Sequence, residues 1–142
     1  MIAIASDHGG YDLKAKVIKH LTEKGLCVKD YGCYSTDSCD YPDFIRPAAW
    51  AVASGEAERG IVICTTGIGV SIVCNRIPGI RGALCTSVTL ARLTREHNDS
   101  NVLALGAGVT GELLAIDIVD TWIQTEFSHL EKHQRRINKI EG

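Results

Sequence analysis

The segment IVICTTGIGVSI, residues 61–72, passes from a run of apolar residues into a stretch of small residues and glycines. Its apolar half predicts a strand buried on both faces of a sheet, and its second half predicts a turn into a helix. The segment lacks both the G-x-G-x-x-G spacing of a dinucleotide-binding turn and the lysine of a P-loop. We interpret it as a turn whose amides bind a phosphate or a developing oxyanion.

Apolar runs of the same kind alternate with amphipathic stretches along the rest of the chain. Pro47 is expected in or near the first turn of its helix, since deeper placement would remove a hydrogen bond. The apolar face of the helix at 111–127 is predicted to consist of Leu113, Ile116, Val119 and Ile123. We expect strands at residues 1–5, 26–32, 60–64, 80–86 and 102–106, and helices at 11–24, 44–54, 70–76, 87–97, 111–127 and 129–141.

Continuous apolar strands separated by helices indicate a parallel sheet with helices on both faces. The predicted fold class is α/β, a single-domain, Rossmann- or flavodoxin-like three-layer αβα sandwich over residues 1–142. It contains a five-stranded parallel sheet in the order 2-1-3-4-5 and a C-terminal helical tail. Ligands in such sheets bind at the carboxyl ends of the strands where the strand order reverses. We therefore expect a crevice between the first and third strands.

Composition excludes several classes of partner. The chain has 142 residues, a formal net charge of −2 and no long apolar run, which argues against nucleic acid and membranes as partners. With no signal peptide at its start, the protein is expected to be cytoplasmic. Its six cysteines are interpreted as thiols, because the chain is larger than a disulfide scaffold and is expected in a reducing compartment. No spacing typical of a structural zinc site occurs. No metal is expected.

Two segments meet at the predicted crevice. The first contains Asp7, His8 and two glycines, and the alternative interpretation is that Asp7 simply caps the helix that follows. The second contains Cys64, which ends the third strand beside the glycine turn. A cysteine at this place can equally be a small buried apolar residue. The adjacent threonines and glycines favour a functional thiolate.

Two polar segments later in the chain are further candidates. REHNDSN, residues 95–101, contains His97 and is expected at the same edge of the sheet as the crevice, although a histidine at a helix end can also simply complement the helix dipole. EKHQRR, residues 131–136, contains Lys132, His133 and Arg136. Two of these share a helix face that can bind a phosphate, whereas the alternative is a solvated charged face.

Taken together, SDHGG, DYPDF, ICTTGIGVSI, REHNDSNVLALG and HQRRI resemble the type B ribose-5-phosphate isomerases and their sugar-phosphate isomerase relatives over essentially the whole chain. The resemblance implies five parallel strands and an aldose–ketose isomerase without a metal or cofactor. It also implies a homodimer or a dimer of dimers in which each active site is built from two subunits.

The resemblance implies that Cys64 is the general base that moves a proton between C1 and C2 of the open-chain sugar. Thr66 would assist proton movement between the two oxygens, His97 would open the furanose ring, and Asp7 would hold sugar hydroxyls. The other implied substrate-binding residues are His8, Tyr41, Gly67, Ile68, Gly69, Val70, Ser71, Asn98, Lys132, His133 and Arg136.

Three residues depart from the family pattern. Thr65 replaces a common glycine, Lys132 replaces an arginine, and Gly108 stands where many members carry an arginine. The expected reaction is the interconversion of ribose 5-phosphate and ribulose 5-phosphate. The alternatives are an allose-6-phosphate or galactose-6-phosphate isomerase, or a subunit of one, and a sugar-phosphate-binding module without catalysis.

Overall fold

The sheet contains five parallel strands in the order β2-β1-β3-β5-β4 in the computed structural model, which describes residues 1–142. All carboxyl ends of the strands therefore lie at one edge of the sheet, which we name the carboxyl edge, and all amino ends lie at the opposite, amino edge. The strands are β1 (Ile2–Ser6), β2 (Val28–Asp30), β3 (Arg59–Cys64), β4 (Gly82–Leu84) and β5 (Val102–Gly106).

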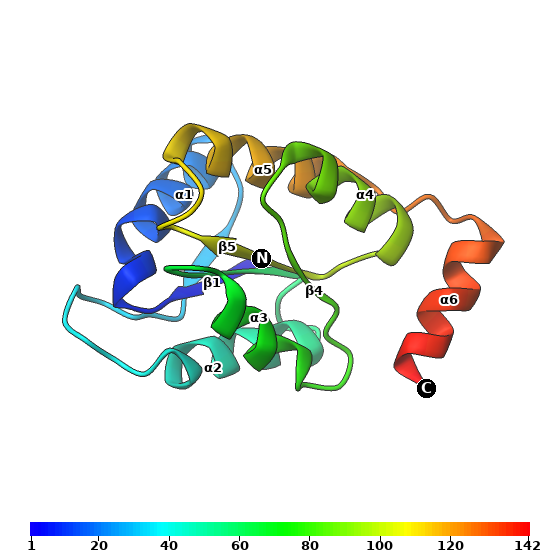
Figure 1. Cartoon of the computed structure of the whole chain (residues 1–142), viewed down its shortest axis with the longest axis horizontal. Coiled ribbons are helices and arrows are strands. Elements are labelled where there is room, and N and C mark those ends of the chain that lie inside the picture. The colour runs from blue at the N-terminus through cyan, green and yellow to red at the C-terminus, as the bar shows by residue number, and fades with distance from the viewer.

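Helices cover both faces of the sheet, as the sequence predicts (Figure 1). Helices α2 and α3 pack on the face that carries Ala3, Ala5 and Ala104, and helices α1, α4 and α5 pack on the face that carries Ile4 and Ile61. None of the helices is both long enough and apolar enough to span a membrane. The helices are η1, a 3-10 turn (His8–Gly10), α1 (Tyr11–Glu23), α2 (Tyr41–Ala53), α3 (Ile68–Asn75), α4 (Val88–Asn98), α5 (Glu112–Gln124) and α6 (Glu131–Glu141).

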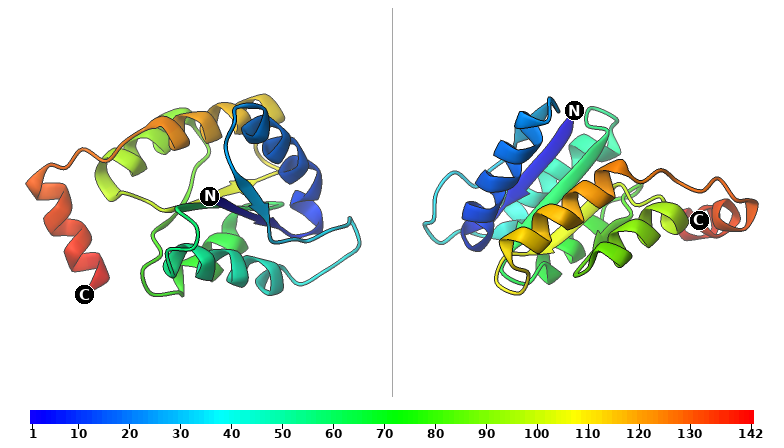
Figure 2. Two further views of the ribbon diagram at one scale, coloured as in Figure 1. Left: turned by 180° about the vertical axis from the view of Figure 1, so that it is seen from behind. Right: turned by 90° about the horizontal axis from the view of Figure 1, so that it is seen from above.

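Helix α6 forms the predicted C-terminal tail and stands outside the three layers. Figures 1 and 2 show it at the end of the molecule opposite to the loops that follow β1, β3 and β5. It therefore belongs to the amino edge of the sheet.

The predicted strand order 2-1-3-4-5 is wrong in its last two positions, because β5 lies between β3 and β4. All five residues of β5 are buried, whereas the three residues of β4 are half-buried. A strand in the middle of a parallel sheet needs apolar residues on both faces, whereas an edge strand does not. The short β4 therefore takes the edge, and the reversal of strand order between β1 and β3 is unchanged.

Helix α2 begins three residues before its predicted start, and the prediction that Pro47 lies in or near the first turn is wrong. Pro42 takes the first-turn position instead, and Pro47 lies inside the helix on its exposed face. A proline inside a helix costs about 3 kcal/mol. The burial of Ile45, Ala48 and Ala49 against the sheet offsets this cost.

The predicted apolar face of α5 is rotated from the observed one. The fully buried residues are Ala115, Ile118, Val119 and Trp122, whereas Leu113 is 84% exposed. The prediction included Val119 but left out Ala115, Ile118 and Trp122. The Trp122 indole N–H donates to Oγ of Ser100 at 2.9 Å, so this side chain is accommodated in the core without an unpaired polar group.

The rotation of α5 predicts a contrast in stability between two single substitutions. Replacement of Ile118 by alanine should lower the free energy of unfolding by about 2–5 kcal/mol, because it leaves a cavity in the core. The Leu113→Ala variant should change it by less than about 0.5 kcal/mol, as an exposed site does. Urea unfolding of both variants measures the difference, and an equal loss in both would contradict the assigned face.

Candidate active site

Cys64 ends β3 at the carboxyl edge, and its sulfur accepts a hydrogen bond from the turn that follows. The Gly67 N–H lies 3.1 Å from Sγ, and the cysteine is only 6% exposed. Gly67 has a φ of +80°, and a Cβ at this position would lie 2.5 Å from Cδ1 of Leu84. Only glycine fits there, so the backbone holds this amide on the sulfur. Hydrogen bonds to charged acceptors are the stronger ones, so the amide is placed to stabilise negative charge on Cys64.

The amides of the glycine turn divide into those with a partner and those without one. The Ile68 N–H donates to Oγ1 of Thr66 at 3.2 Å, and the Ser71 N–H donates to the Gly67 carbonyl at 3.2 Å. The amides of Gly69 and Val70 belong to the first turn of α3, where N–H groups have no partner within the helix. Of the predicted turn amides, these two remain available to an oxyanion.

Tyr41 approaches the same turn from the start of α2. A Cβ on Gly69 would lie 2.8 Å from Cζ of the Tyr41 ring, so the tyrosine packs directly on the glycine backbone. The ring is 37% exposed. Tyr41 therefore lies at the predicted site, with its hydroxyl close to Gly69.

Asp7 and Thr65 connect the two loops that meet at the reversal of strand order. Oδ1 of Asp7 accepts a hydrogen bond from the Gly10 N–H at 3.0 Å, so the capping interpretation of Asp7 holds. A Cβ on Gly9 would lie 2.3 Å from Oγ1 of Thr65. The first loop therefore packs against the residue that follows Cys64, and the predicted juxtaposition of the two segments is observed.

His8 is held by a loop to which the sequence analysis assigned no role. Its Nδ1 accepts a hydrogen bond from the Cys39 N–H at 3.2 Å, and Sγ of Cys39 lies 3.8 Å from the same nitrogen. Burial raises the pKa of the Cys39 thiol, which keeps it protonated. Because Nδ1 is an acceptor, the ring hydrogen lies on Nε2, which is free to donate to a ligand. No sequence motif marks this contact between residues 31 positions apart.

The prediction that His97 and Asn98 share the edge of Cys64 is wrong. Helix α4 ends at Asn98, and three residues later the Asn101 carbonyl accepts a hydrogen bond from Gly60, the second residue of β3. A helix that joins two parallel strands runs back along the sheet and ends where the next strand begins. His97 and Asn98 therefore lie at the amino edge, away from Cys64.

The basic tail lies beside His97. The rings of His97 and His133 have their centroids 4.5 Å apart, and Nδ1 of His133 lies 2.7 Å from Oγ of Ser128. Burial lowers the pKa of His133, and the neighbouring His97, Lys132 and Arg136 lower it further, which favours its neutral form.

The two remaining predicted tail residues point outward. Lys132 and Arg136 are exposed and form no ion pair, whereas Arg135 of the same helix pairs with Glu131 at 2.7 Å. His133 lies on the buried side of α6. The tail thus presents two uncompensated positive charges next to His97.

The cavities of a single chain do not coincide with the predicted crevice. The largest, about 660 Å³, lies at the amino edge and is lined by residues that include Arg81, Asn98 and Glu141. At the carboxyl edge, a hollow of about 230 Å³ is lined by Gly9, Thr110 and neighbouring residues, but not by Cys64. One chain therefore holds two separate groups of candidate residues and no pocket that contains both.

Known proteins share this fold and sequence over nearly the full length of the chain. Ribose-5-phosphate isomerase B of Escherichia coli is 44% identical over 139 residues, which are 98% of this chain and 93% of that protein. The structure of Clostridium thermocellum ribose-5-phosphate isomerase B matches with a TM-score of 0.97 at 53% identity, over 99% of this chain and 94% of that chain. The corresponding Thermotoga maritima structure matches with a TM-score of 0.95 at 48% identity, over 99% and 96%.

Residues 2–140 also match the family described as Ribose/Galactose Isomerase. This match covers both the strand-end loops that carry Cys64 and the helix ends that carry His97 and the basic tail. The sequence and the fold both match over nearly the full chain, and the chain belongs to the Ribose/Galactose Isomerase family.

Proposed function

We propose that the protein is an aldose–ketose isomerase that interconverts ribose 5-phosphate and ribulose 5-phosphate. The observation that carries this proposal is the contact between the Cys64 sulfur and the Gly67 amide at the first turn of α3, with the Gly69 and Val70 amides next to it. The isomerisation needs one base that reaches two adjacent carbons and donors that stabilise the oxygen on which charge develops. The turn supplies both.

The proton transfers follow from this arrangement. The Cys64 thiolate takes the proton from C2 of the open-chain aldose, and the electron pair of the broken bond forms the C1–C2 double bond while O1 becomes negative. The amides of Gly69 and Val70 hold this enediolate. Thr66 assists the movement of a proton from O2 to O1, and Cys64 returns its proton to C1 to complete the ketose.

Ring opening requires a different residue. Ribose 5-phosphate is mainly a furanose, and its opening needs a proton acceptor at the anomeric hydroxyl and a donor at the ring oxygen. In this proposal His97 performs the step, with Asn98 orienting the sugar. Lys132, His133 and Arg136 then bind the phosphate together with His8. His133 also packs against His97, with the two ring centroids 4.5 Å apart.

Because His97 and Cys64 lie at opposite edges of one sheet, a second copy of the chain must complete the site. We infer a homodimer in which the amino edge of one copy faces the carboxyl edge of the other. Ile72 is 60% exposed on α3 and Leu90 is 46% exposed on α4. Exposed apolar residues on the helices next to the two halves of the site support burial between subunits.

A six-carbon sugar phosphate is the second candidate substrate. The contact between Thr65 and Gly108 is the observation that supports this alternative. A Cβ on Gly108 would lie 2.8 Å from Cγ2 of Thr65, and the Gly108 N–H donates to the Thr65 carbonyl at 2.8 Å. Two departures from the family pattern thus touch each other beside Cys64. The ratio of kcat/KM for ribose 5-phosphate to that for allose 6-phosphate and galactose 6-phosphate, measured on the purified chain, distinguishes the substrates.

Replacement of Cys64 tests the base. Both Cys64→Ala and Cys64→Ser should lower kcat by more than about 100-fold, because general acid–base catalysis contributes at least that factor and a serine hydroxyl is too weak a base. Circular dichroism and phosphate binding should stay unchanged, since only a small side chain is lost. A Cys64→Ala variant that keeps more than about a hundredth of the wild-type kcat would place the base elsewhere.

Mixing two inactive variants tests the shared site. Cys64→Ala and His97→Asn should each fail to convert ribose 5-phosphate. When equal amounts are unfolded together and refolded, heterodimers should regain one intact site, and activity should return to about a quarter of the wild-type value, as two-fold symmetry requires. The measurement is turnover against mixing ratio. Absence of recovery, or full activity of a monomer at micromolar concentration, would contradict the shared site.

Arg136 and Arg135 form a matched pair on α6 that tests phosphate binding. Arg136→Ala should lower kcat/KM roughly tenfold to a hundredfold, mainly through a higher KM, because a hydrogen bond between charged groups is lost. Arg135→Ala should have little effect, because this side chain is already paired with Glu131. Steady-state kinetics of both variants give the comparison, and equal effects would remove the assigned role of Arg136.

A further inference from the structure

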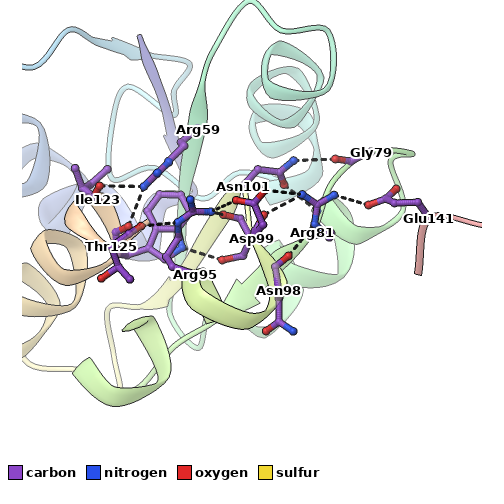
Figure 3. A network of polar contacts seen from close by, with 12 residues as sticks. Arg59, Gly79, Arg81, Arg95, Asn98, Asp99, Asn101, Ile123, Thr125 and Glu141 are labelled. Carbon is purple, nitrogen blue, oxygen red and sulfur yellow. Dashed lines mark hydrogen bonds and ion pairs between the residues drawn. The ribbon is translucent and has the colours of Figure 1, made fainter. Parts of the chain in front are cut away.

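Arg81 joins the ends of two helices that carry the second group of candidate residues (Figure 3). It lies just before β4, and its side chain is 18% exposed. Its guanidinium donates from Nε to the Asn98 carbonyl and from Nη2 to the Asp99 carbonyl, both at 2.9 Å. Its Nη1 lies 2.5 Å from Oε1 of Glu141, the last residue of α6.

The carbonyls bound by Arg81 are those that the end of α4 leaves without helical partners. The last carbonyls of any helix need hydrogen-bond donors from outside the helix. Here the chain turns sharply at Asp99, which has a φ of +45°, and Arg95 Nη1 holds its carboxylate at 2.8 Å. His97 immediately precedes the residue that Arg81 binds. The direction in which its ring leaves the helix end therefore depends on these contacts.

The backbone of Arg81 is itself fixed in place. Its N–H donates to Oδ1 of Asn101 at 2.8 Å, and Nδ2 of the same asparagine donates to the Gly79 carbonyl at 2.8 Å. The Asn101 N–H donates back to the Arg81 carbonyl at 3.1 Å. Arg81 is thus held on the sheet while its side chain reaches both helix ends.

The link to Glu141 orients α6. This helix stands outside the three layers of the fold, and its first turn is held by the contact between the tilted rings of His97 and His133. The ion pair with Arg81 holds its last turn. Arg136 lies between these two contacts and Lys132 directly precedes His133, so the positions of both exposed charges depend on the direction of the helix axis.

We propose that Arg81 is a positioning residue for ring opening, and that it acts by fixing His97 and Asn98 at the end of α4 and, through Glu141, the orientation of α6. This inference rests on the proposed isomerase function and names a residue outside the assigned site. A lysine cannot replace it, because a planar fork with several donors serves three acceptors on two helices, whereas an ammonium group is a single point charge.

The test separates ring opening from proton transfer. Ribulose 5-phosphate has its O5 blocked by phosphate and cannot close to a furanose, so solvent exchange at its C1 reports the Cys64 step without ring opening. His97→Asn provides the reference, with conversion of ribose 5-phosphate lost and exchange retained. Arg81→Lys should reproduce this pattern, with kcat on ribose 5-phosphate lowered about tenfold to a hundredfold, as for a misplaced catalytic group, and exchange lowered far less.

Two matched variants serve as controls. Glu141→Gln removes only the link to α6 and should raise KM in both reactions without changing their ratio. Arg92→Gln removes the exposed pair with Glu96 on the same helix as His97 and should change neither reaction. Parallel losses of both reactions in Arg81→Lys, or turnover of ribose 5-phosphate within about twofold of the wild type, would overturn the positioning role.

A readout that needs no activity keeps this inference separate from the proposed function. The imidazole NMR signals of His97 and His133 should shift in Arg81→Lys and stay in place in Arg92→Gln. Unshifted signals would overturn the inference even if the protein is an isomerase. If the wild-type protein shows no C1 exchange, the isomerase proposal fails, and shifted imidazole signals would still show that Arg81 positions His97.

Discussion

The parallel arrangement of strands that are buried on both faces is the constraint on which the rest of the structure depends. Every strand must end at the same edge, and every connecting helix must return the chain to the other edge. The loops after β1 and β3 therefore bring Asp7, His8 and Cys64 together, while the end of α4 carries His97 to the opposite edge. The topology of the parallel sheet therefore separates the two groups of candidate residues.

Close backbone approach organises the carboxyl edge. Gly9, Gly67, Gly69 and Gly108 each stand where a Cβ would lie within 3 Å of a neighbouring atom. Their absence of side chains lets three loops and the ring of Tyr41 contact one another around the end of β3. The amides at the start of α3 become usable because this packing holds the turn in one conformation, which reduces the reorganisation needed when charge develops on a bound oxygen.

Arginine side chains organise the amino edge by donating hydrogen bonds to backbone carbonyls. Arg59 donates to the carbonyls of Trp122 and Ile123 at 2.9 and 3.0 Å, and Arg95 donates to those of Ser100 and Thr125 at 2.6 and 3.1 Å (Figure 3). The carbonyls of Trp122, Ile123 and Thr125 lie at the end of α5, and that of Ser100 lies just after α4. Guanidinium groups replace the water that would otherwise bind them. Each edge of the sheet is thus rigid for a different physical reason.

The sequence by itself determined the α/β class, the alternation of strands and helices and the meeting of Asp7 with the turn after Cys64, because burial on both faces and the period of apolar residues are local properties. It also indicated His97 and the basic tail through residue type. Tertiary structure alone decided that β5 takes an interior position between β3 and β4, that Trp122 and not Leu113 faces the core, and that Cys39 holds His8. These depend on competition among distant segments for the same burial, which no local pattern records. The placement of His97 away from Cys64 combines both sources. The return path of a connecting helix could have been deduced from the sequence, but the contact of His97 with His133 depends on where the tail packs.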